Sequence, residues 1–588
     1  MEKWFIKNRK DLNIDYEKYG LNKILYRIAL NRGIESEEEL DKFLHPTLDK
    51  LYSPILLKDM VKSANLILSH ISKGNKIRIV GDYDVDGVTS TFVLMKGLKN
   101  IGAIVDYDIP HRVHDGYGIN NRIIDQACED DISLIITCDN GIAAFEPVLY
   151  GKSKGIDIII TDHHEVPKDF EGGDLFPEAD GVIDPKRQDS QYPFYEICGC
   201  TVAFKVITYL YLIKGKDEEE LYQDFLPYVT IATICDVMPL KDENRILVSQ
   251  GLLALRRNKD IGLCALIDAC DIKKEDLSVY HIGFILGPTI NSSGRLESAE
   301  KALELFLSQD PIEAKHIATT LRTYNRERQD YTEEAVEKAE ILIKKENLLQ
   351  KMPILVLYIP NINESIVGIV AGRLKEKYCR PTIVLTDSKG LMKGSGRSIK
   401  EYNMFEEISK YKSYLTSFGG HAMAAGLSLG KDQLVPFIVE INNNTFLTKD
   451  DLVPKRYIDM ELPLKYINYN LIEELKIFEP YGNGNETPQF GAKNLLIENV
   501  AIFGKNKNVI KLQLKDKNCR EIGLLFEDSK IFLNRLSKVY GREAVVSFLN
   551  HNNTFKFYID ILYYPGINTF RGNTNIELKI KSYRIVGE

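Results

Sequence analysis

The chain has few cysteines, no long apolar run and no strong net charge, and each shortage excludes a class of protein. Its nine cysteines are scattered over 588 residues, with Cys198 and Cys200 as the one close pair. This usage predicts a reducing cytoplasm rather than a disulfide framework. A zinc site at this pair would need a second thiolate pair at ligand spacing, which the sequence lacks. No apolar run reaches the ~18 residues of a membrane span, and the N-terminal residues lack the apolar core of a signal peptide.

Composition and length describe a globular protein of several domains. The hydrophobic content of 44% and charged content of 27% are ordinary for such proteins, and 588 residues predict three to four domains. The net charge of −8 argues mildly against a nucleic-acid partner. A binding surface needs only local positive charge, however, so the global value excludes little.

Acidic and imidazole side chains follow three short β-branched runs. The runs are Lys76–Val80, Leu134–Cys138 and Ile156–Thr161, and the side chains that follow them are Asp82, Asp84, Asp86, Asp139, Asp162, His163 and His164. Parallel strands bind ligands beyond their carboxyl ends, so these groups should gather in one crevice. Crowded carboxylates stay ionised only when cations neutralise them. Oxygen ligands with imidazole suit Mn²⁺ or Mg²⁺ better than a soft thiolate metal.

Other interpretations of these residues compete with a catalytic metal site. Asp82, Asp84, Asp86 and Gly87 match the first half of a calcium loop, but Val93 stands where that loop needs Glu. A solvated acidic turn is a further alternative.

The remaining candidates are less specific. His163 and His164 cannot point the same way, so one would bind metal while the other faces the substrate as a donor or proton shuttle. Asp236, within an apolar stretch, needs a partner because a buried charge is costly unless it is paired or metal-bound.

Element patterns divide the chain into six parts. We expect an N-terminal helical or mixed segment (1–70), an α/β domain with a parallel sheet (71–310), a long linker helix (311–350), a second α/β domain (351–453), a small β-barrel (454–565) and a tail (566–588). The expected barrel strands are Asn494–Val500, Val509–Leu514, Ala544–Phe548 and Phe555–Ile561.

Several basic residues lie in patterns that suit phosphate. Arg295 and Arg397 stand in Gly/Ser-rich stretches that predict turns, where backbone N–H groups beside a guanidinium bind anions. Gly419–His421 is either a similar cradle or a helix start. In the barrel, Lys511 and Lys515 alternate with apolar residues and face solvent, which suits a single-stranded backbone or is an ordinary solvated face.

Eight motifs together resemble a known superfamily. They are DYDVDG, TCDNG, TDHH, ICDVMPL, SSGR, GIVAGRLKE, KGSGRS and FGGHAMAAG, in order between about residues 70 and 490. The set resembles the DHH phosphoesterases and, within them, the RecJ-type single-stranded-DNA-specific exonucleases. The resemblance implies a DHH catalytic domain and a DHH-associated domain joined by the long helix, followed by an OB-like barrel. It implies 5′-to-3′ hydrolysis to 5′-mononucleotides by a two-metal mechanism, in DNA repair and recombination.

The resemblance also implies roles for individual residues. Two Mn²⁺ or Mg²⁺ ions would be held by Asp82, Asp84, Asp86, Asp139, His163 and Asp236. His164 would contact the scissile phosphate or the attacking water, and Arg295 and His421 would hold DNA or phosphate, with Arg295 offsetting transition-state charge. Arg112, Ser395 and Arg397 would grip the terminal phosphate. Val80 departs from the superfamily pattern, which often has His there.

The expected partners follow from the same resemblance. They are single-stranded DNA, a helicase and a single-strand-binding protein, with the chain itself a monomer and no membrane involved. The alternatives are a DHH-family phosphodiesterase for short RNA, cyclic dinucleotides or pyrophosphate, and an inactive single-strand-binding relative.

Overall fold

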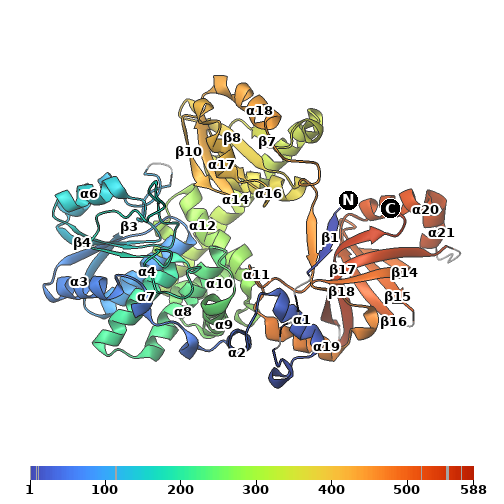
Figure 1. The fold of residues 1–588 in the computed structure, drawn as a ribbon, viewed down its shortest axis with the longest axis horizontal. Helices are drawn as coiled ribbons and strands as arrows, with labels where there is room; N and C mark the ends of the chain where they lie inside the picture. Colours follow the sequence, from blue (N-terminus) through green and yellow to red (C-terminus); the bar gives the residue numbers. More distant parts are fainter. Residues whose placement is uncertain are drawn as a thin grey trace. The chain divides into compact units, whose positions relative to one another are not determined.

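The computed structural model describes residues 2–7, 10, 12, 14–112, 115–517, 519–550, 555–570 and 572–588 (Figure 1). The chain divides into two compact units. The first comprises residues 47–239 and 243–454, and the second comprises residues 2–46, 240–242 and 455–588. No helix among the described residues is long and apolar enough to cross a bilayer.

A five-stranded parallel sheet forms the centre of the first α/β domain, as the sequence predicts. Its order is β3-β2-β4-β5-β6, with β2 Lys76–Val80, β3 Ile104–Asp108, β4 Ile132–Cys138, β5 Asp157–Thr161 and β6 Gly181–Ile183. Every neighbouring pair is parallel, so all carboxyl ends lie at one edge. The strands are nearly continuous β-branched runs because a parallel sheet is buried on both faces.

Helices surround this sheet and continue beyond it. They are α3 Met60–Ser72, α4 Val85–Asn100, α5 Asn121–Glu129, α6 Phe145–Ser153, α7 Gly199–Lys214, α8 Glu218–Cys235, α9 Asp242–Arg257, α10 Ile261–Ala269, α11 Val279–His281, α12 Gly287–Leu296 and α13 Glu300–Leu307. The expected linker is one helix, α14 Pro311–Lys345, followed by α15 Leu348–Lys351. Asp310 caps α14 by accepting from Ile312 N, and Pro311 occupies its first turn, where the missing N–H costs nothing.

The second α/β domain has a mixed sheet of order β10-β11-β9-β8-β7. Its strands are β7 Leu355–Tyr358, β8 Thr382–Ser388, β9 Leu391–Arg397, β10 Ser417–His421 and β11 Ala424–Leu429, and its helices are α16 Val367–Tyr378, α17 Met404–Ser409 and α18 Leu434–Asn443. Only β7 and β8 are parallel. The apolar side chains of α16 pack with Leu355, Leu357 and Val384.

The second unit contains a closed barrel. Strands β14 Phe490–Phe503, β15 Val509–Asp516, β16 Cys519–Phe526, β17 Phe557–Phe570 and β18 Asn573–Ile585 carry it, with the short β13 Met460–Glu461 at the edge. Pairing of β14 with β17 closes the sheet. The expected tail is therefore wrong from residue 566 on, because β18 pairs with both β16 and β17.

One expected barrel strand is a helix. Ala544–Phe548 lies in α21 Arg542–Leu549, which follows α20 Ser529–Tyr540. Ala544, Val545 and Phe548 are its buried residues, a spacing of one, three and four that fits a helical face. Local strand preference is weak, and tertiary packing overrides it here.

The N-terminal segment packs into the same core as the barrel. α1 Lys23–Asn31 and α2 Glu37–Leu44 share one apolar cluster with α19 Tyr469–Leu475 and the barrel strands. β1 Lys3–Ile6 pairs in parallel with β12 Lys455–Ile458. The buried Arg32 guanidinium lies 3.0 Å from the Asp459 carboxylate.

Candidate metal centre

The acidic residues predicted from the sequence gather at the carboxyl edge of the parallel sheet. Asp82 and Asp84 follow β2, Asp86 lies in the first turn of α4, Asp139 follows β4, and His163 follows β5. Asp84 Oδ1 accepts from Gly87 N at 3.1 Å and caps α4.

His163 lies at the centre of the cluster. Its Nε2 is 3.1 Å from Asp139 Oδ1, 3.6 Å from Asp86 Oδ2 and 3.7 Å from Asp236 Oδ2. Burial lowers the pKa of His163 to about 3, so its imidazole is neutral. A neutral imidazole surrounded by carboxylates is the form that binds a metal.

The carboxylates of the cluster have raised pKa values because they are buried close to one another. Burial, followed by the neighbouring aspartates, raises the pKa of Asp82, Asp139 and Asp236 well above the usual range and that of Asp86 to about 6. Asp82 Oδ1 and Asp236 Oδ2 are buried without hydrogen-bond partners. Buried carboxylates this close together remain ionised only beside a cation.

Ligand atoms are close enough for metal binding in three overlapping groups. They are Asp139, His163 and His164; Asp86, His163 and Asp236; and Asp82, Asp84 and Asp139, each within 4.8 Å. Oxygen atoms with one or two imidazoles suit a divalent cation such as Mn²⁺ or Mg²⁺. All six predicted ligands therefore lie in one place, while Val80 ends β2 with an apolar side chain that binds no metal.

Backbone donors position Asp86. Its two carboxylate oxygens accept from Gly199 N at 2.7 Å and Cys200 N at 2.8 Å, at the start of α7. Gly199 is required because a Cβ there would lie 2.7 Å from Asp139 Cβ. The Cys198 and Cys200 thiols are fully buried, and burial raises their pKa well above the ordinary value. Among the described residues neither thiol belongs to a group with metal-ligand spacing, and it is the backbone N–H of Cys200 that contacts Asp86.

Asp162 orients the second histidine. Its Oδ1 lies 2.8 Å from His164 Nδ1 and its Oδ2 accepts from Ile142 N at 2.9 Å. Burial alone would lower the pKa of His164, but the Asp162 hydrogen bond and charge raise it to about 9. Tyr117 Oη donates to Asp139 O at 2.7 Å and lies 3.2 Å from His164 Nδ1. No sequence pattern predicted this contact of Tyr117.

A group of arginines adjoins the acidic cluster. Burial, then Arg112 and Arg328, lowers the pKa of Arg295 to about 9, and burial followed by Arg112 lowers that of Arg397. Arg328 has a lowered pKa because of burial and Arg373. Neighbouring cations repel one another, and a bound anion would relieve that repulsion. Arg373 lies in the GIVAGRLKE motif but received no role from it, and Arg328 lies in α14 outside the eight motifs.

Hydrogen bonds fix two of these arginines in place. Arg295 Nη1 donates to Ser365 O at 2.7 Å, and Arg397 Nη1 donates to Ser395 Oγ at 2.6 Å and to Gly396 O at 2.8 Å. The Arg112 guanidinium lies 4.1 Å from the Tyr83 ring centroid. The predicted turns are wrong: Arg295 lies in the last turn of α12 and Arg397 ends β9.

Strand register places His421 in one row with Arg397. Arg397 pairs with Ala424, which pairs with His421, and Ser395 pairs with Gly426, which pairs with Gly419. Paired residues share a face of the sheet, and a Cβ on Gly419 or Gly426 would have no neighbour within 4 Å. The face beside Ser395 and Arg397 is therefore almost bare backbone. Gly419–His421 is a strand, neither a cradle nor a helix start.

Three family descriptions match separate parts of the chain. They are the DHH family, N-terminal domain (residues 76–233), the DHHA1 domain (351–446) and the RecJ OB domain (458–582). A single-stranded-DNA-specific exonuclease RecJ from Haemophilus influenzae is 31% identical over 95% of this chain and 95% of its own length. The chain belongs to the RecJ family.

Other members of the RecJ family are similar over different extents. The RecJ of Bacillus subtilis is 35% identical over 85% of this chain, which spans 62% of that relative's length. The crystal structure of Thermus thermophilus RecJ with Mn²⁺ shares the fold, with a TM-score of 0.80 and 24% identity over 99% of this chain and 79% of that one. The crystal structure of an exonuclease RecJ bound to manganese has a TM-score of 0.57 and 29% sequence identity, and the match covers 67% of this chain and 96% of that one.

A fourth strand end adds an acid that sequence reasoning missed. Asp184 follows β6, is fully buried, and accepts from Lys186 N at 2.8 Å through Oδ1 while its Oδ2 has no partner. Burial, followed by the charge of Asp162, raises its pKa to about 8. The signal was present, since Gly181–Ile183 is another β-branched run that ends in Asp.

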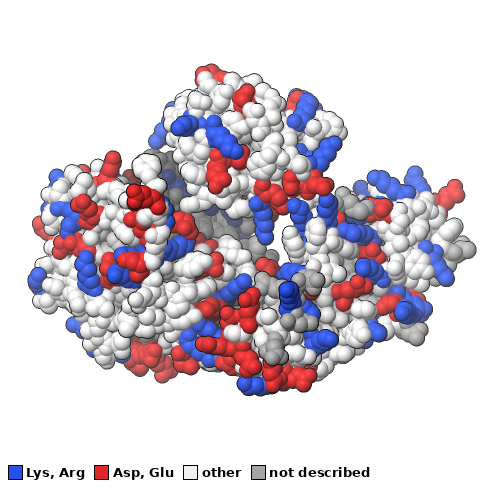
Figure 2. All heavy atoms as spheres, in the orientation of Figure 1, with Lys and Arg blue, Asp and Glu red and all other residues white. Residues whose placement is uncertain are grey.

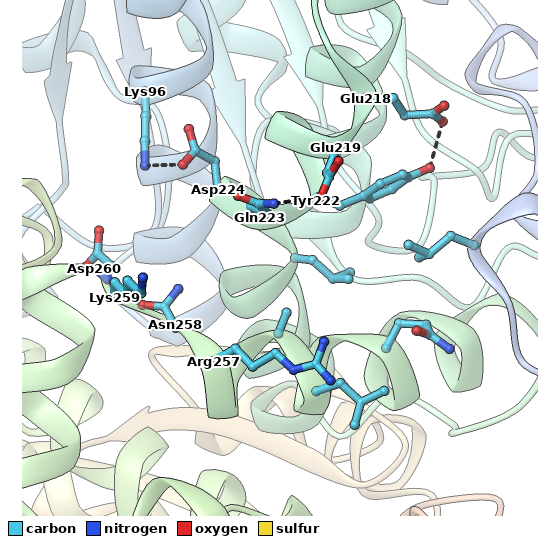
Figure 3. A pocket seen from close by; sticks show the side chains of 15 residues that line it. Lys96, Glu218, Glu219, Tyr222, Gln223, Asp224, Arg257, Asn258, Lys259 and Asp260 are labelled. Atoms are coloured by element: carbon cyan, nitrogen blue, oxygen red, sulfur yellow. Dashed lines mark hydrogen bonds and ion pairs between the residues drawn. The ribbon is translucent and has the colours of Figure 1, made fainter.

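A hollow of about 790 Å³ lies apart from these residues (Figure 3). Its charged lining residues are Lys96, Glu218, Glu219, Asp224, Arg257, Lys259 and Asp260. Lys96 lies 3.0 Å from Asp224, and Tyr222 donates to Glu218. No predicted site residue lines it, so this RecJ-family chain carries its candidate chemistry elsewhere.

The two barrel lysines differ in their surroundings. Lys515 Nζ lies 3.6 Å from Glu498, which also binds Arg520 at 2.6 Å. Among the described residues, Lys511 has no such acidic partner. Basic and acidic side chains are interspersed over much of the face shown in Figure 2, which agrees with the modest net charge.

Proposed function

We propose that this protein is a single-stranded-DNA-specific exonuclease that works from the 5′ end and releases 5′-mononucleotides with two Mn²⁺ or Mg²⁺ ions. The observation that carries the proposal is the position of His163, within 4 Å of Asp86, Asp139 and Asp236, in a site that also includes the half-buried Arg295. Single-stranded DNA is supported as the substrate because the RecJ relatives are named single-stranded-DNA-specific exonucleases. DNA repair and recombination are the expected setting on the resemblance alone.

The acidic cluster would hold the ions. Asp86, Asp236 and His163 form one ligand group and Asp82, Asp84 and Asp139 form another, and Asp139 also contacts His163, so it is the natural ligand shared between them. When bound, divalent cations acidify a water molecule and neutralise phosphate charge. The amides of Gly199 and Cys200 keep Asp86 aimed at this position.

His164 and Arg295 would act on the phosphate itself. The Asp162 carboxylate keeps His164 protonated near neutral pH, so His164 can donate a hydrogen bond to a phosphate oxygen or the attacking water. Arg295, fixed by Ser365 O, supplies positive charge where the reacting phosphate gains negative charge. Arg328 and Arg373 extend the same positive region.

The terminal phosphate would set the direction of cleavage. Ser395 and Arg397 are joined by a hydrogen bond, and Arg112 is close enough to lower the pKa of Arg397. A phosphate bound there leaves the bare strip at Gly419 and Gly426 for the strand's backbone, with His421 at its edge. If a 5′ phosphate is bound beside the metal centre, the first phosphodiester bond from the 5′ end would lie at the metal ions and would be the bond hydrolysed in each turnover.

The location and partners are proposed on the family resemblance alone. We place the protein in the cytoplasm as a monomer that acts with a helicase and a single-strand-binding protein. The barrel, through Lys511 and Lys515, would hold the strand rather than take part in the reaction.

Strands labelled at either end test the proposal directly. With Mn²⁺, a 5′-labelled single strand should release labelled mononucleotide first, while the 3′-labelled strand shortens progressively and the matching duplex persists. EDTA should abolish both reactions. Faster cleavage of short RNA or a cyclic dinucleotide would favour the other DHH activity, and binding without cleavage would favour an inactive relative.

A further inference from the structure

Two stacked aromatic side chains project into solvent beside the metal centre's supporting helices. The rings of Tyr280 and Phe284 lie 5.2 Å apart at 26° to each other. Tyr280 is 61% exposed and Phe284 is 69% exposed in the whole chain. Each therefore leaves a large apolar surface in water, which is unfavourable relative to burial.

The backbone beneath this pair is tightly held. Phe284 lies in η5 Ile282–Leu286, a π-helical turn between α11 and α12. Such turns interrupt regular helices and are frequent at functional sites. A Cβ on Gly287 would come within 2.3 Å of Cys235 Sγ, and one on Gly283 within 3.5 Å of Ile234. The turn thus packs directly on the last turn of α8.

This packing ties the aromatic pair to two site residues. Asp236, a candidate metal ligand, directly follows Cys235, against which the turn packs. The helix that begins at Gly287 ends with Arg295 in its last turn. The same short segment therefore joins the pair to a metal ligand on one side and to a phosphate-facing guanidinium on the other.

We propose that Tyr280 and Phe284 form a stacking platform for unpaired bases of the strand that occupies the metal centre. This inference rests on the proposed function. A strand held by its phosphates at Arg295 and Arg397 still exposes the flat apolar faces of its bases. Aromatic rings bind such faces without reading sequence, which suits an enzyme that must accept every nucleotide. A base-paired strand does not offer these faces, so the platform also favours single strands.

Single abasic nucleotides test the contact. Binding of labelled single strands is measured by anisotropy in EDTA, with one abasic position moved stepwise from the 5′ end. Tyr280→Ala with Phe284→Ala should weaken binding of the unmodified strand by about tenfold, in the range known for base stacking. Wild type should lose a similar factor at one or two abasic positions, and the double variant should lose nothing further there.

Controls separate stacking from other roles. Phe284→Leu keeps apolar area without an aromatic face and should behave like Phe284→Ala, while Leu212→Ala, an equally exposed apolar residue (71%) on α7, should leave binding unchanged. Equal losses for variant and wild type at every abasic position would overturn the proposal. So would a change in oligomeric mass with unchanged DNA binding, which would make the pair a protein interface.

Failure of the proposed function would appear in a different measurement. Wild-type protein that neither binds nor cleaves an unmodified strand would sink both ideas. If wild-type protein cleaves the strand, but the double variant loses as much affinity at every abasic position as wild type does, only the stacking platform would be refuted.

Discussion

Asp139 Oδ1 lies 3.1 Å from His163 Nε2, although the two residues come from the ends of different strands. Asp139 also belongs to the ligand group of Asp82 and Asp84. Among the described residues it is the one aspartate that belongs to two of the three ligand groups, the group with His163 and His164 and the group with Asp82 and Asp84. Its position directly after β4, which lies between β2 and β5 in the sheet, explains this double contact.

Asp139→Ala should therefore be the most damaging change among the ligands. We expect cleavage to fall by about four orders of magnitude, which corresponds to roughly 5.4 kcal/mol of transition-state stabilisation. Single-turnover rates on a labelled strand at saturating Mn²⁺ measure this. Asp84→Ala, which removes a partly exposed ligand, is the comparison. A smaller loss for Asp139→Ala than for Asp84→Ala would contradict the shared-ligand role.

Arg397→Ala should remove recognition of a 5′ phosphate. The guanidinium bonds to Ser395 Oγ at 2.6 Å and is half-buried, so its loss removes one of the two positive charges of the proposed pocket and leaves only that of Arg112. The preference for 5′-phosphorylated over 5′-hydroxyl strands should fall by about tenfold or more, since charge-assisted hydrogen bonds contribute about 1.5–3 kcal/mol.

The control for this change lies on the same strand. Lys393 is also basic but pairs with Glu364 at 3.3 Å, so Lys393→Ala should keep the preference. Metal-dependent thermal stabilisation should be unchanged in both variants. An Arg397→Ala protein that still prefers 5′-phosphorylated ends would remove Arg397 from the pocket.

Asp184→Asn should stabilise the metal-free protein at neutral and alkaline pH. Burial raises the pKa of Asp184 to about 8, so the folded state keeps its proton where the unfolded state has lost it. The stability that the protonated acid provides is complete below pH 4 and is lost as pH rises through 8. Asn cannot ionise, and its Oδ1 still accepts from Lys186 N.

Chemical unfolding in EDTA at pH 5, 7 and 8.5 measures this difference. The variant should gain progressively over wild type, by at most about 5 kcal/mol at the highest pH. Asp184→Ala is the comparison, because it removes both the charge and the hydrogen bond. A constant difference across this range would mean that Asp184 is ionised in the folded protein throughout.

The sequence predicted those parts of the site that follow a local rule. β-branched runs ending in Asp or His predicted the parallel sheet and the meeting of Asp82, Asp139 and His163, because strand ends share one edge. Asp236 obeys a different rule: it caps α8 and reaches the same point only through helix packing. The amides of Gly199 and Cys200 on Asp86 carry no side-chain signal at all.

Long-range packing accounts for most of what was missed. Arg32 and Asp459 form a buried pair across 427 residues, and neither has a neighbour in sequence that predicts it. The same holds for α1 and α2, which share a core with the barrel. β18 is a different case: Ile576, Leu578 and Ile580 alternate with polar residues, a local strand signal that was overlooked.

Lys511 and Lys515 should differ in their contribution to DNA binding. Both lie on the solvent face of β15, but Lys515 adjoins Glu498 at 3.6 Å and Lys511 has no acidic partner among the described residues. Lys511→Ala should flatten the slope of log K against log salt by about 0.7, the value for one phosphate contact on a single strand. Lys515→Ala should flatten it less, because Glu498 already offsets its charge.

Glu498→Gln provides the decisive control. Removing that carboxylate frees both Lys515 and Arg520, so binding of long strands should tighten and the salt slope should steepen. Hydrolysis of a very short oligonucleotide should stay near the wild-type rate in all three variants, because the barrel holds the strand rather than reacting with it. If none of the three changes alters the slope, the strand does not cross this face of β15, and the two lysines are ordinary solvated residues.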